Sequence, residues 1–185
     1  MQGARALSHD ELNEILAIAS PRDRVLVLTG ISFGTRISEA LKLTFADVEG
    51  EVLHLKSSKN SSNQGFPIPA GYKEAIKALK AFYRDKGLEP KQHTRIFLET
   101  HVLPFHVMSR QAASDAVRRL AKKIGAEGKV SSHSFRKSFV TRIYEKTGFN
   151  IAETQKYSRH KSLGNLQYYI QTCENMDLVS DSLWG

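Results

Sequence analysis

The sequence predicts a single domain of the α+β class that is mainly α-helical, with a small antiparallel β-hairpin at one edge. Three observations support this prediction. Apolar residues recur at helical spacing through most of the 185 residues. One segment, 52–69, instead alternates with the period of a strand around a polar turn. The length suits one sizeable core, and because no repeat or low-complexity linker divides the chain, residues 1–185 are predicted to form one domain.

Three helices are expected in the first 45 residues. Ser8 and Glu11 form a capping box that begins the first helix, whose predicted apolar face includes Ile18. Pro21 begins the second helix, which two glycines interrupt, and a short third helix runs on from Ile37. These segments together predict a helical N-terminal half.

The middle and end of the chain add a hairpin and further helices. Residues 52–56 and 66–69 are predicted strands, and the polar stretch 57–65 forms a long tip between them. Residues 87–108 are expected to be irregular, apart from a short strand at 96–98. Further helices are predicted at 71–86, 109–124, 132–146, 150–157 and 162–170.

Charge and composition narrow the class of partner. The chain has 27 Lys and Arg against 19 Asp and Glu, a net charge of +8 that favours polyanions, with DNA or RNA first and acidic membranes second. Its single cysteine, Cys173, excludes an internal disulfide framework and suits a reducing compartment. The first residues do not resemble a signal peptide, and no apolar run could span a membrane. We therefore expect a cytoplasmic protein without a membrane partner.

The side chains that carry the chemistry suit a phosphodiester. His133 and Arg136 are three residues apart on one predicted helix, and Arg36 begins another after a glycine-containing turn. Two guanidinium groups on separate elements can grip one phosphate and stabilise a pentacoordinate transition state. A tyrosine could attack that phosphorus if nearby cations lowered its pKa and a neutral imidazole took its proton. A lysine on a hairpin tip, such as Lys59, could return a proton to the departing sugar hydroxyl.

A metal or an organic cofactor is not expected. The chain lacks an acidic cluster, a nucleotide-binding GxxxxGK[ST] motif and a zinc-binding HExxH motif. His101 and His106 have no third ligand at a suitable spacing. A covalent phosphotyrosine would also conserve the bond energy, so rejoining would need no nucleotide.

These motifs together resemble the catalytic domain of the tyrosine recombinases, the phage-integrase and Xer class. The resemblance runs from about residue 7 to residue 169 and depends on the order and spacing of several motifs, since a histidine and an arginine three residues apart are common by chance. The matching positions are the stretch Gly34–Leu41, a hairpin lysine, His133 with Arg136, and His160 with Tyr169 nine residues later. The resemblance implies a fold of the DNA breaking-rejoining enzyme type and site-specific recombination of double-stranded DNA, by integration or excision, without a metal.

The resemblance also implies roles for the phosphate-binding residues. Arg36 and Arg136 would clamp the phosphate, and His160 would hydrogen-bond to it. His133 would assist proton transfer, and Glu39 would brace the helix of Arg36 without reacting.

The remaining catalytic positions leave alternatives open. Tyr169 would be the nucleophile that forms the 3′-phosphotyrosyl link, with Tyr168 as a less favoured neighbour. Lys59 would be the general acid, with Lys56 as its rival because the hairpin is longer than usual. The family's usual Leu-Gly-His here reads Ser-Arg-His, so Arg159 replaces a glycine and could touch DNA or change the local turn.

The resemblance extends to partners and assembly. A homotetramer on two duplexes, possible accessory DNA-bending proteins and an exchange of residues 172–185 between neighbours are expected. The chain lacks the N-terminal DNA-clamping domain of most relatives, so it resembles either an isolated catalytic fragment or a compact single-domain inverting recombinase. A catalytically inactive DNA-binding regulator and a DNA-relaxing enzyme of the type IB topoisomerase kind remain alternatives. The candidate DNA contacts are Arg118, Arg119, Lys122, Lys137 and Arg159.

Overall fold

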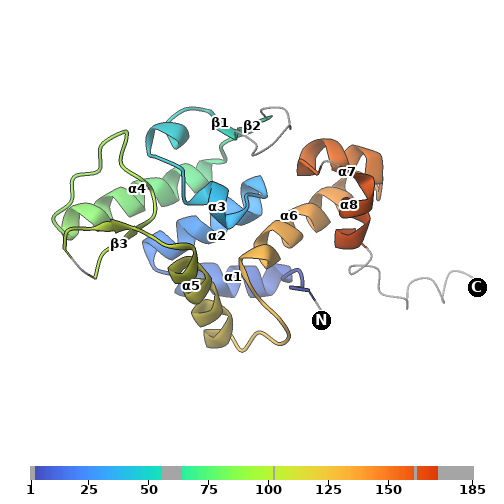
Figure 1. Ribbon diagram of the computed structural model, residues 1–185, viewed down its shortest axis with the longest axis horizontal. Coiled ribbons are helices and arrows are strands. Elements are labelled where there is room, and N and C mark those ends of the chain that lie inside the picture. The colour runs from blue at the N-terminus through green and yellow to red at the C-terminus, as the bar shows by residue number, and fades with distance from the viewer. Residues whose placement is uncertain (1–2, 56–63, 102, 161, 171–185) are drawn as a thin grey trace, which may run out of the picture.

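The computed structural model describes residues 3–55, 64–101, 103–160 and 162–170, and it is mainly helical with two small antiparallel sheets (Figure 1). Within these residues no helix has the length and apolar character needed to cross a bilayer. The elements in chain order are α1 (His9–Ile18), α2 (Pro21–Phe33), α3 (Ile37–Ala40), the 3-10 turn η1 (Ala46–Val48), β1 (Val52–Leu55), β2 (Gln64–Pro67), α4 (Ala70–Asp85), β3 (Leu98–Glu99), β4 (His106–Val107), α5 (Arg110–Lys123), α6 (Ser132–Lys146), α7 (Ile151–Ser158) and α8 (Leu163–Ile170).

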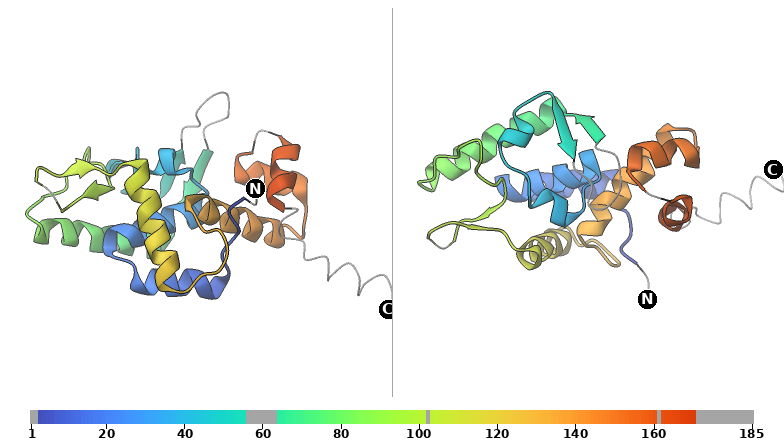
Figure 2. Two further views of the ribbon diagram at one scale, coloured as in Figure 1. Left: turned by 60° about the horizontal axis from the view of Figure 1, so that its bottom comes forward. Right: turned by 45° about the horizontal axis from the view of Figure 1, so that its top comes forward.

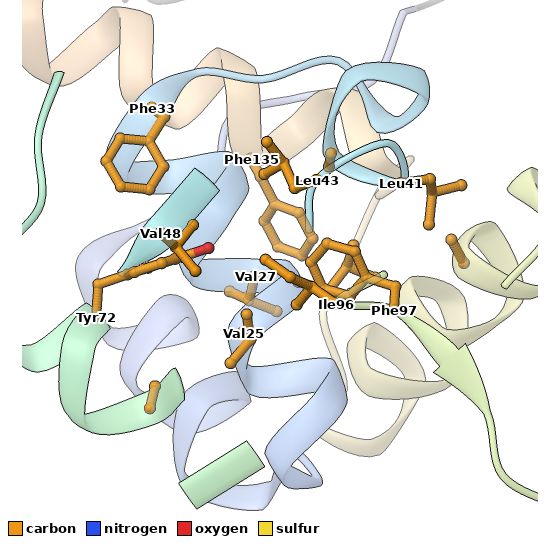
Figure 3. Packing of buried hydrophobic residues seen from close by; sticks show 14 of the residues in the cluster. Val25, Val27, Phe33, Leu41, Leu43, Val48, Tyr72, Ile96, Phe97 and Phe135 are labelled. Carbon is orange, nitrogen blue, oxygen red and sulfur yellow. The ribbon is translucent and has the colours of Figure 1, made fainter. Parts of the chain in front are cut away.

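Helix α2 is the centre of the fold. It packs most extensively against α4 and α6, and its residues Val25 and Val27 are fully buried. Figure 3 shows these two valines among buried side chains from α4, α6 and the segment before β3. The Tyr72 hydroxyl of α4 lies 2.9 Å from the Thr29 hydroxyl of α2, so the core also contains a satisfied polar pair. Burial of most residues from Val25 onward explains why that part of α2 is largely apolar, whereas its charged residues lie in the first turn.

Two glycines let α6 approach α2 closely. A Cβ atom built at Gly30, inside α2, would lie only 2.6 Å from the Cβ of Phe135. Gly34 ends α2 in the left-handed conformation with φ of 58°, and a Cβ there would collide with the ring of Phe139. The close approach places Arg136, which lies between these two phenylalanines on α6, beside the end of α2.

The sheet formed by β1 and β2 packs against the helical core. Strands β1 and β2 pair antiparallel, with Val52 opposite Pro67 and Leu55 opposite Gln64, and they direct Leu53 and Phe66 into the core. The Gln64 side chain donates a hydrogen bond to the Lys156 carbonyl at 3.3 Å, which ties the end of the paired strands nearest the hairpin tip to α7. The predicted hairpin is therefore confirmed, although β2 begins two residues earlier than expected.

The chain folds back at one end, where α7 and α8 pack against α6. Both views place this pair beyond the hairpin and opposite α4 (Figures 1 and 2). Asn150 caps the first turn of α7 by accepting hydrogen bonds from two backbone amides, as its position predicted. Leu166 and Ile170 of α8 are buried and anchor that helix.

Three expectations about local structure were wrong. Ile18 is 44% exposed because it is the last residue of α1 and lies at the turn into α2. Gly30 lies inside a continuous α2 and does not interrupt it; the small residue is needed there because Phe135 packs too closely to leave room for a side chain. Segment 87–108 contains a second hairpin: the expected strand at 96–98 overlaps β3 at Leu98, but its partner β4 was missed, because a two-residue strand is too short to produce a periodic signal.

Candidate active site

Arg136 is the most deeply buried of the predicted site residues that the structure describes, with 1% of its surface exposed. Its guanidinium donates hydrogen bonds to the Gly34 carbonyl, at the end of α2, and to the Ser158 carbonyl, 3.2 Å away at the end of α7. Helix C-termini carry partial negative charge and so favour a cation. These acceptors offset the cost of burying the charge and hold the guanidinium plane in a defined orientation.

His160 lies directly against Arg136, two residues after α7. Its Nε2 is 3.4 Å from an Nη of Arg136, and its Nδ1 is 2.8 Å from the Ser158 hydroxyl. A guanidinium can only donate hydrogen bonds, so this network assigns the lone pair to Nε2 and the proton to Nδ1. The Gln155 side chain holds the turn by donating to the His160 carbonyl at 3.1 Å.

The electrostatic surroundings keep His160 neutral. Burial lowers the pKa of this imidazole to about 4, and the positive charges of Arg136 and Arg36 act in the same direction. The ring is therefore uncharged at neutral pH. Arg36 lies on the same side of the molecule as His160, because Glu39 contacts both Arg36 and Arg159, the residue that precedes His160.

Arg36 occupies the N-cap position of α3 and remains accessible, with 47% of its side chain exposed. Its backbone amide donates to Glu39 Oε2 at 2.9 Å, and its Nη1 lies 3.4 Å from Glu39 Oε1. Glu39 thus contacts both the main chain and the side chain of Arg36, the geometry that a bracing residue needs. Arg36, Arg136 and His160 are brought together from three separate elements.

His133 is placed differently from Arg136. It lies in the first turn of α6, where its backbone amide donates to the Ser131 hydroxyl at 3.2 Å, and its side chain is exposed. Among the described residues, no hydrogen bond joins its ring to Arg36, Arg136 or His160. Its proposed role in proton transfer stays a prediction.

The general acid and the nucleophile are not tested by the structure. Lys59 and Lys56 lie outside the described residues, between the ends of β1 and β2. The backbones of Tyr168 and Tyr169 lie in α8, but their side chains are outside what is described. Helix α8 packs against α6 and α7, the helices that carry Arg136 and lead into His160.

The candidate DNA contacts fall into two groups. Arg118, Arg119 and Lys122 are exposed on α5, as a phosphate contact requires, and Arg118 pairs with Asp115 on the same helix. Lys137 is 6% exposed and the Arg159 side chain 4%, so both present little surface to a ligand. All five remain predictions as DNA contacts, and burial disfavours the last two.

Sequence reasoning missed the groups that hold the site together. The carbonyls of Gly34 and Ser158 and the hydroxyl of Ser158 orient Arg136 and His160, and a backbone carbonyl has no sequence signal. The replacement of the family's usual leucine by Ser158 was the one available sign of a polar partner. In the part of the chain that the structure describes, no cluster of three or more His, Cys, Asp or Glu residues could hold a metal ion.

Comparison with known proteins finds relatives among the Xer recombinases. The chain is 24% identical over 172 residues to tyrosine recombinase XerD of Halalkalibacterium halodurans, covering 89% of this chain and 56% of that protein. It is 31% identical over 157 residues to XerD of Corynebacterium glutamicum, covering 82% and 50%. The chain therefore spans about half the length of these relatives.

Solved structures share the fold. A post-cleavage complex of the XerH site-specific recombinase with a palindromic difH substrate matches with a TM-score of 0.75 at 22% identity, covering 99% of this chain and 54% of that one. A lambda integrase dimer bound to a COC′ core site matches with a TM-score of 0.66 at 21% identity, covering 91% and 60%. At this level of identity the two matches establish a common fold.

The family model described as "Phage integrase family" matches residues 5–176, which is most of the chain and includes the arginines and histidine described above. The stretch Gly34–Leu41 and the pair of His133 and Arg136, on which the sequence resemblance depends, both lie inside this match. The chain belongs to the phage integrase family.

Proposed function

We propose that this protein is a tyrosine-type site-specific recombinase that cuts and rejoins double-stranded DNA through a 3′-phosphotyrosyl intermediate. The observation that carries the proposal is the convergence of Arg36, Arg136 and His160 from α3, α6 and the turn after α7. Two guanidinium groups and an imidazole beside each other form a site for one phosphodiester. Membership of the phage integrase family supports this assignment.

Arg136 and Arg36 contribute to phosphate binding in different ways. Arg136 is held rigidly by carbonyl acceptors before DNA arrives, so its charge is preorganised. Arg36 keeps an exposed side chain and completes the clamp when the phosphate enters. Because negative phosphate favours protonation of the adjacent ring, His160 gains an Nε2 proton on DNA binding and donates a hydrogen bond to a phosphate oxygen.

The covalent step transfers one phosphoryl group and needs no cofactor. The Tyr169 oxygen attacks phosphorus as its proton passes to His133, and the bond from phosphorus to the 5′ oxygen breaks. Lys59, or Lys56 in its place, protonates that leaving oxygen. Attack by a new 5′ hydroxyl on the phosphotyrosine reverses the sequence and joins the strands.

The proposed assembly is a homotetramer on two duplexes, with residues 172–185 exchanged between neighbours and with possible accessory DNA-bending proteins. The XerH structure holds a difH substrate and the lambda integrase structure holds a COC′ core site, which supports duplex DNA as the partner of this chain. We propose that residues 1–185 act as one catalytic domain in the cytoplasm. Removing residues 172–185 should weaken assembly on DNA before it weakens folding, and unchanged assembly would contradict the exchange.

Covalent capture from a randomised pool of duplexes tests the reaction and identifies the target in one experiment. Each duplex carries a nick that lets the cut end diffuse away. The pool is incubated with the protein, and DNA that stays attached after denaturation is sequenced. Wild-type protein should capture a restricted set of sequences. Tyr169→Phe should bind the same duplexes without capture, whereas the neighbouring Tyr168→Phe should capture normally.

Three other results would contradict the proposal in different ways. Binding without capture by wild-type protein would indicate a DNA-binding regulator. Capture without sequence preference, together with relaxation of any supercoiled plasmid, would indicate an enzyme of the topoisomerase kind. Capture by Tyr169→Phe but not by Tyr168→Phe would move the nucleophile to the preceding residue.

A further inference from the structure

We propose that Arg159 is a positioning residue that joins the turn carrying His160 to the helix carrying Arg36 through the carboxylate of Glu39. The inference rests on the proposed function, because its consequence is a correctly shaped phosphate clamp. It concerns a position where this chain has arginine in place of the glycine that the family pattern usually has.

The geometry is a shared carboxylate between two arginines. Arg159 Nη1 lies 3.5 Å from Glu39 Oε2, and Arg159 Nη2 lies 3.5 Å from Glu39 Oε1. The same two oxygens are 2.9 Å from the Arg36 amide nitrogen and 3.4 Å from Arg36 Nη1. Glu39 therefore connects two segments that are 120 residues apart in the sequence.

Burial argues for a positioning role over a direct contact with DNA. The Arg159 side chain is 4% exposed and that of Glu39 is 10% exposed, so their charges face each other with little water between them. Removing one charge of such a pair leaves the other poorly compensated. The Arg159 Nε is enclosed without a hydrogen-bond partner among the described residues, and the two Nη atoms both face Glu39, so Glu39 is the contact that positions this side chain.

The backbone at Arg159 strengthens the argument. This residue ends α7 in the left-handed conformation, with φ of 58°, which costs free energy for any residue with a side chain. Its neighbours on both sides, Ser158 and His160, contact Arg136. The ion pair between Arg159 and Glu39 thus fixes the position of segment 158–160, which contacts Arg136, the buried arginine of the phosphate site.

The pair also affects the exposed half of the site. Glu39 attracts the Arg36 side chain, and that attraction must be overcome when Arg36 turns towards a phosphate. Arg159 neutralises part of the carboxylate charge and so weakens its hold on Arg36. Loss of Arg159 should both loosen the His160 turn and draw Arg36 towards Glu39, which lowers the rate of cleavage more than the affinity for DNA.

Single-turnover capture on one nicked duplex selected from the randomised pool tests this inference. For Arg159→Gly, the rate constant at saturating DNA should fall about tenfold, since small misplacements of catalytic groups commonly cost this much or more, while the Kd changes less than about twofold. Arg159→Asn also tolerates the left-handed backbone and should match the glycine variant. Arg159→Lys, which keeps the charge, should recover part of the lost rate.

A double-mutant cycle separates positioning from a general effect of charge. Glu39→Gln should slow capture, and adding Arg159→Gly to it should cause little further loss, because the second residue acts through the first. Arg84→Gln is the control, since Arg84 lies on α4 and forms an exposed ion pair with Glu89, which follows that helix. It should leave the rate unchanged. All rates are measured where circular dichroism shows every variant folded.

Several results would overturn the inference. A wild-type rate for Arg159→Gly and Arg159→Asn would show that the ion pair serves folding alone. A parallel loss of affinity with a shallower salt dependence would show that Arg159 contacts a DNA phosphate directly. If wild-type protein captures no DNA from the pool, the proposed function fails and the inference fails with it, whereas normal wild-type capture with unaffected variants removes the inference alone.

Discussion

Replacing Gly34 by alanine should destabilise the fold at the point where α2 meets α6. Gly34 has φ of 58°, and the left-handed conformation costs an L-residue about 1–2 kcal/mol. An added Cβ would also lie 2.5 Å from Phe139 Cε1 and closer still to Cδ1, and such overpacking costs about 1–3 kcal/mol. The two terms together predict a loss of about 2–5 kcal/mol in the free energy of unfolding.

Gly148→Ala provides the matched control. Gly148 has nearly the same backbone, with φ of 60°, but no atom lies within 4 Å of its added Cβ. This variant should therefore lose only the conformational part, about 1–2 kcal/mol. Urea unfolding followed by circular dichroism measures both losses, and their difference reports the collision with Phe139.

Equal losses for the two glycine variants would refute the close packing of Phe139 on Gly34. The same substitution has a second expected effect, because the Gly34 carbonyl accepts a hydrogen bond from Arg136. A shift of this carbonyl should slow DNA cleavage in Gly34→Ala but not in Gly148→Ala. Slowed cleavage in both variants would separate the activity from this contact.

Three further predictions concern packing and charge. Gly30→Ala should lose stability in urea unfolding because its Cβ would lie 2.6 Å from that of Phe135. The control Gly71→Ala, whose Cβ meets nothing within 4 Å, should gain up to about 1 kcal/mol from helix propensity. A gain in both variants would refute the close contact between α2 and α6. The pKa of His160 is about 4 in the folded protein, against an ordinary value near 6.5 in the unfolded chain. Between these two pH values the unfolded chain binds more protons, so the free energy of unfolding should fall by up to about 3 kcal/mol as pH drops from 6.5 to 4. His160→Gln should show a flatter pH profile of thermal unfolding, and an unchanged profile would contradict the buried neutral ring. Arg5 holds the pKa of Glu11 at about 2, so the stabilisation from this ion pair is present above pH 4.5 and is lost as pH falls towards 2. Arg5 also donates hydrogen bonds to the Ala6 and Glu127 carbonyls, which do not titrate. Arg5→Ala should therefore cost about 1 kcal/mol more at pH 7 than near pH 2, after allowance for solvent screening, and a cost that is the same at both pH values would exclude the ion pair.

Local sequence signals predicted where most helices begin and end. The capping box of Ser8 and Glu11 and the first-turn position of Pro21 each mark a helix start that the structure has. Such signals are local, because a cap is made by residues within one turn of the helix end. The predicted strand at 96–98 overlaps β3 by one residue, but β4 escaped prediction because two residues are too few for an alternating pattern.

The roles of the individual site residues needed more than spacing. His133 and Arg136 are three residues apart on one helix, yet the structure exposes the first and buries the second. Spacing places two residues on neighbouring parts of a helix surface, but the surrounding elements decide which part is covered. The same reasoning applies to Arg159, whose long charged side chain favours the surface in general and is buried here by Glu39.

The sequence by itself determined the helical framework, the basic character and the membership of a DNA-recombining family. Helix caps, apolar periodicity, net charge and the order of motifs depend only on which residue stands at which position. Only the tertiary structure decided how the site is held. Arg136 is bound by the carbonyl of Gly34, 102 residues away, and by that of Ser158, and Glu39 reaches Arg159 across 120 residues. The physical reason is that every residue carries a carbonyl and many carry charge, so the choice of partner depends on which helices pack together, and that packing is a property of the whole chain.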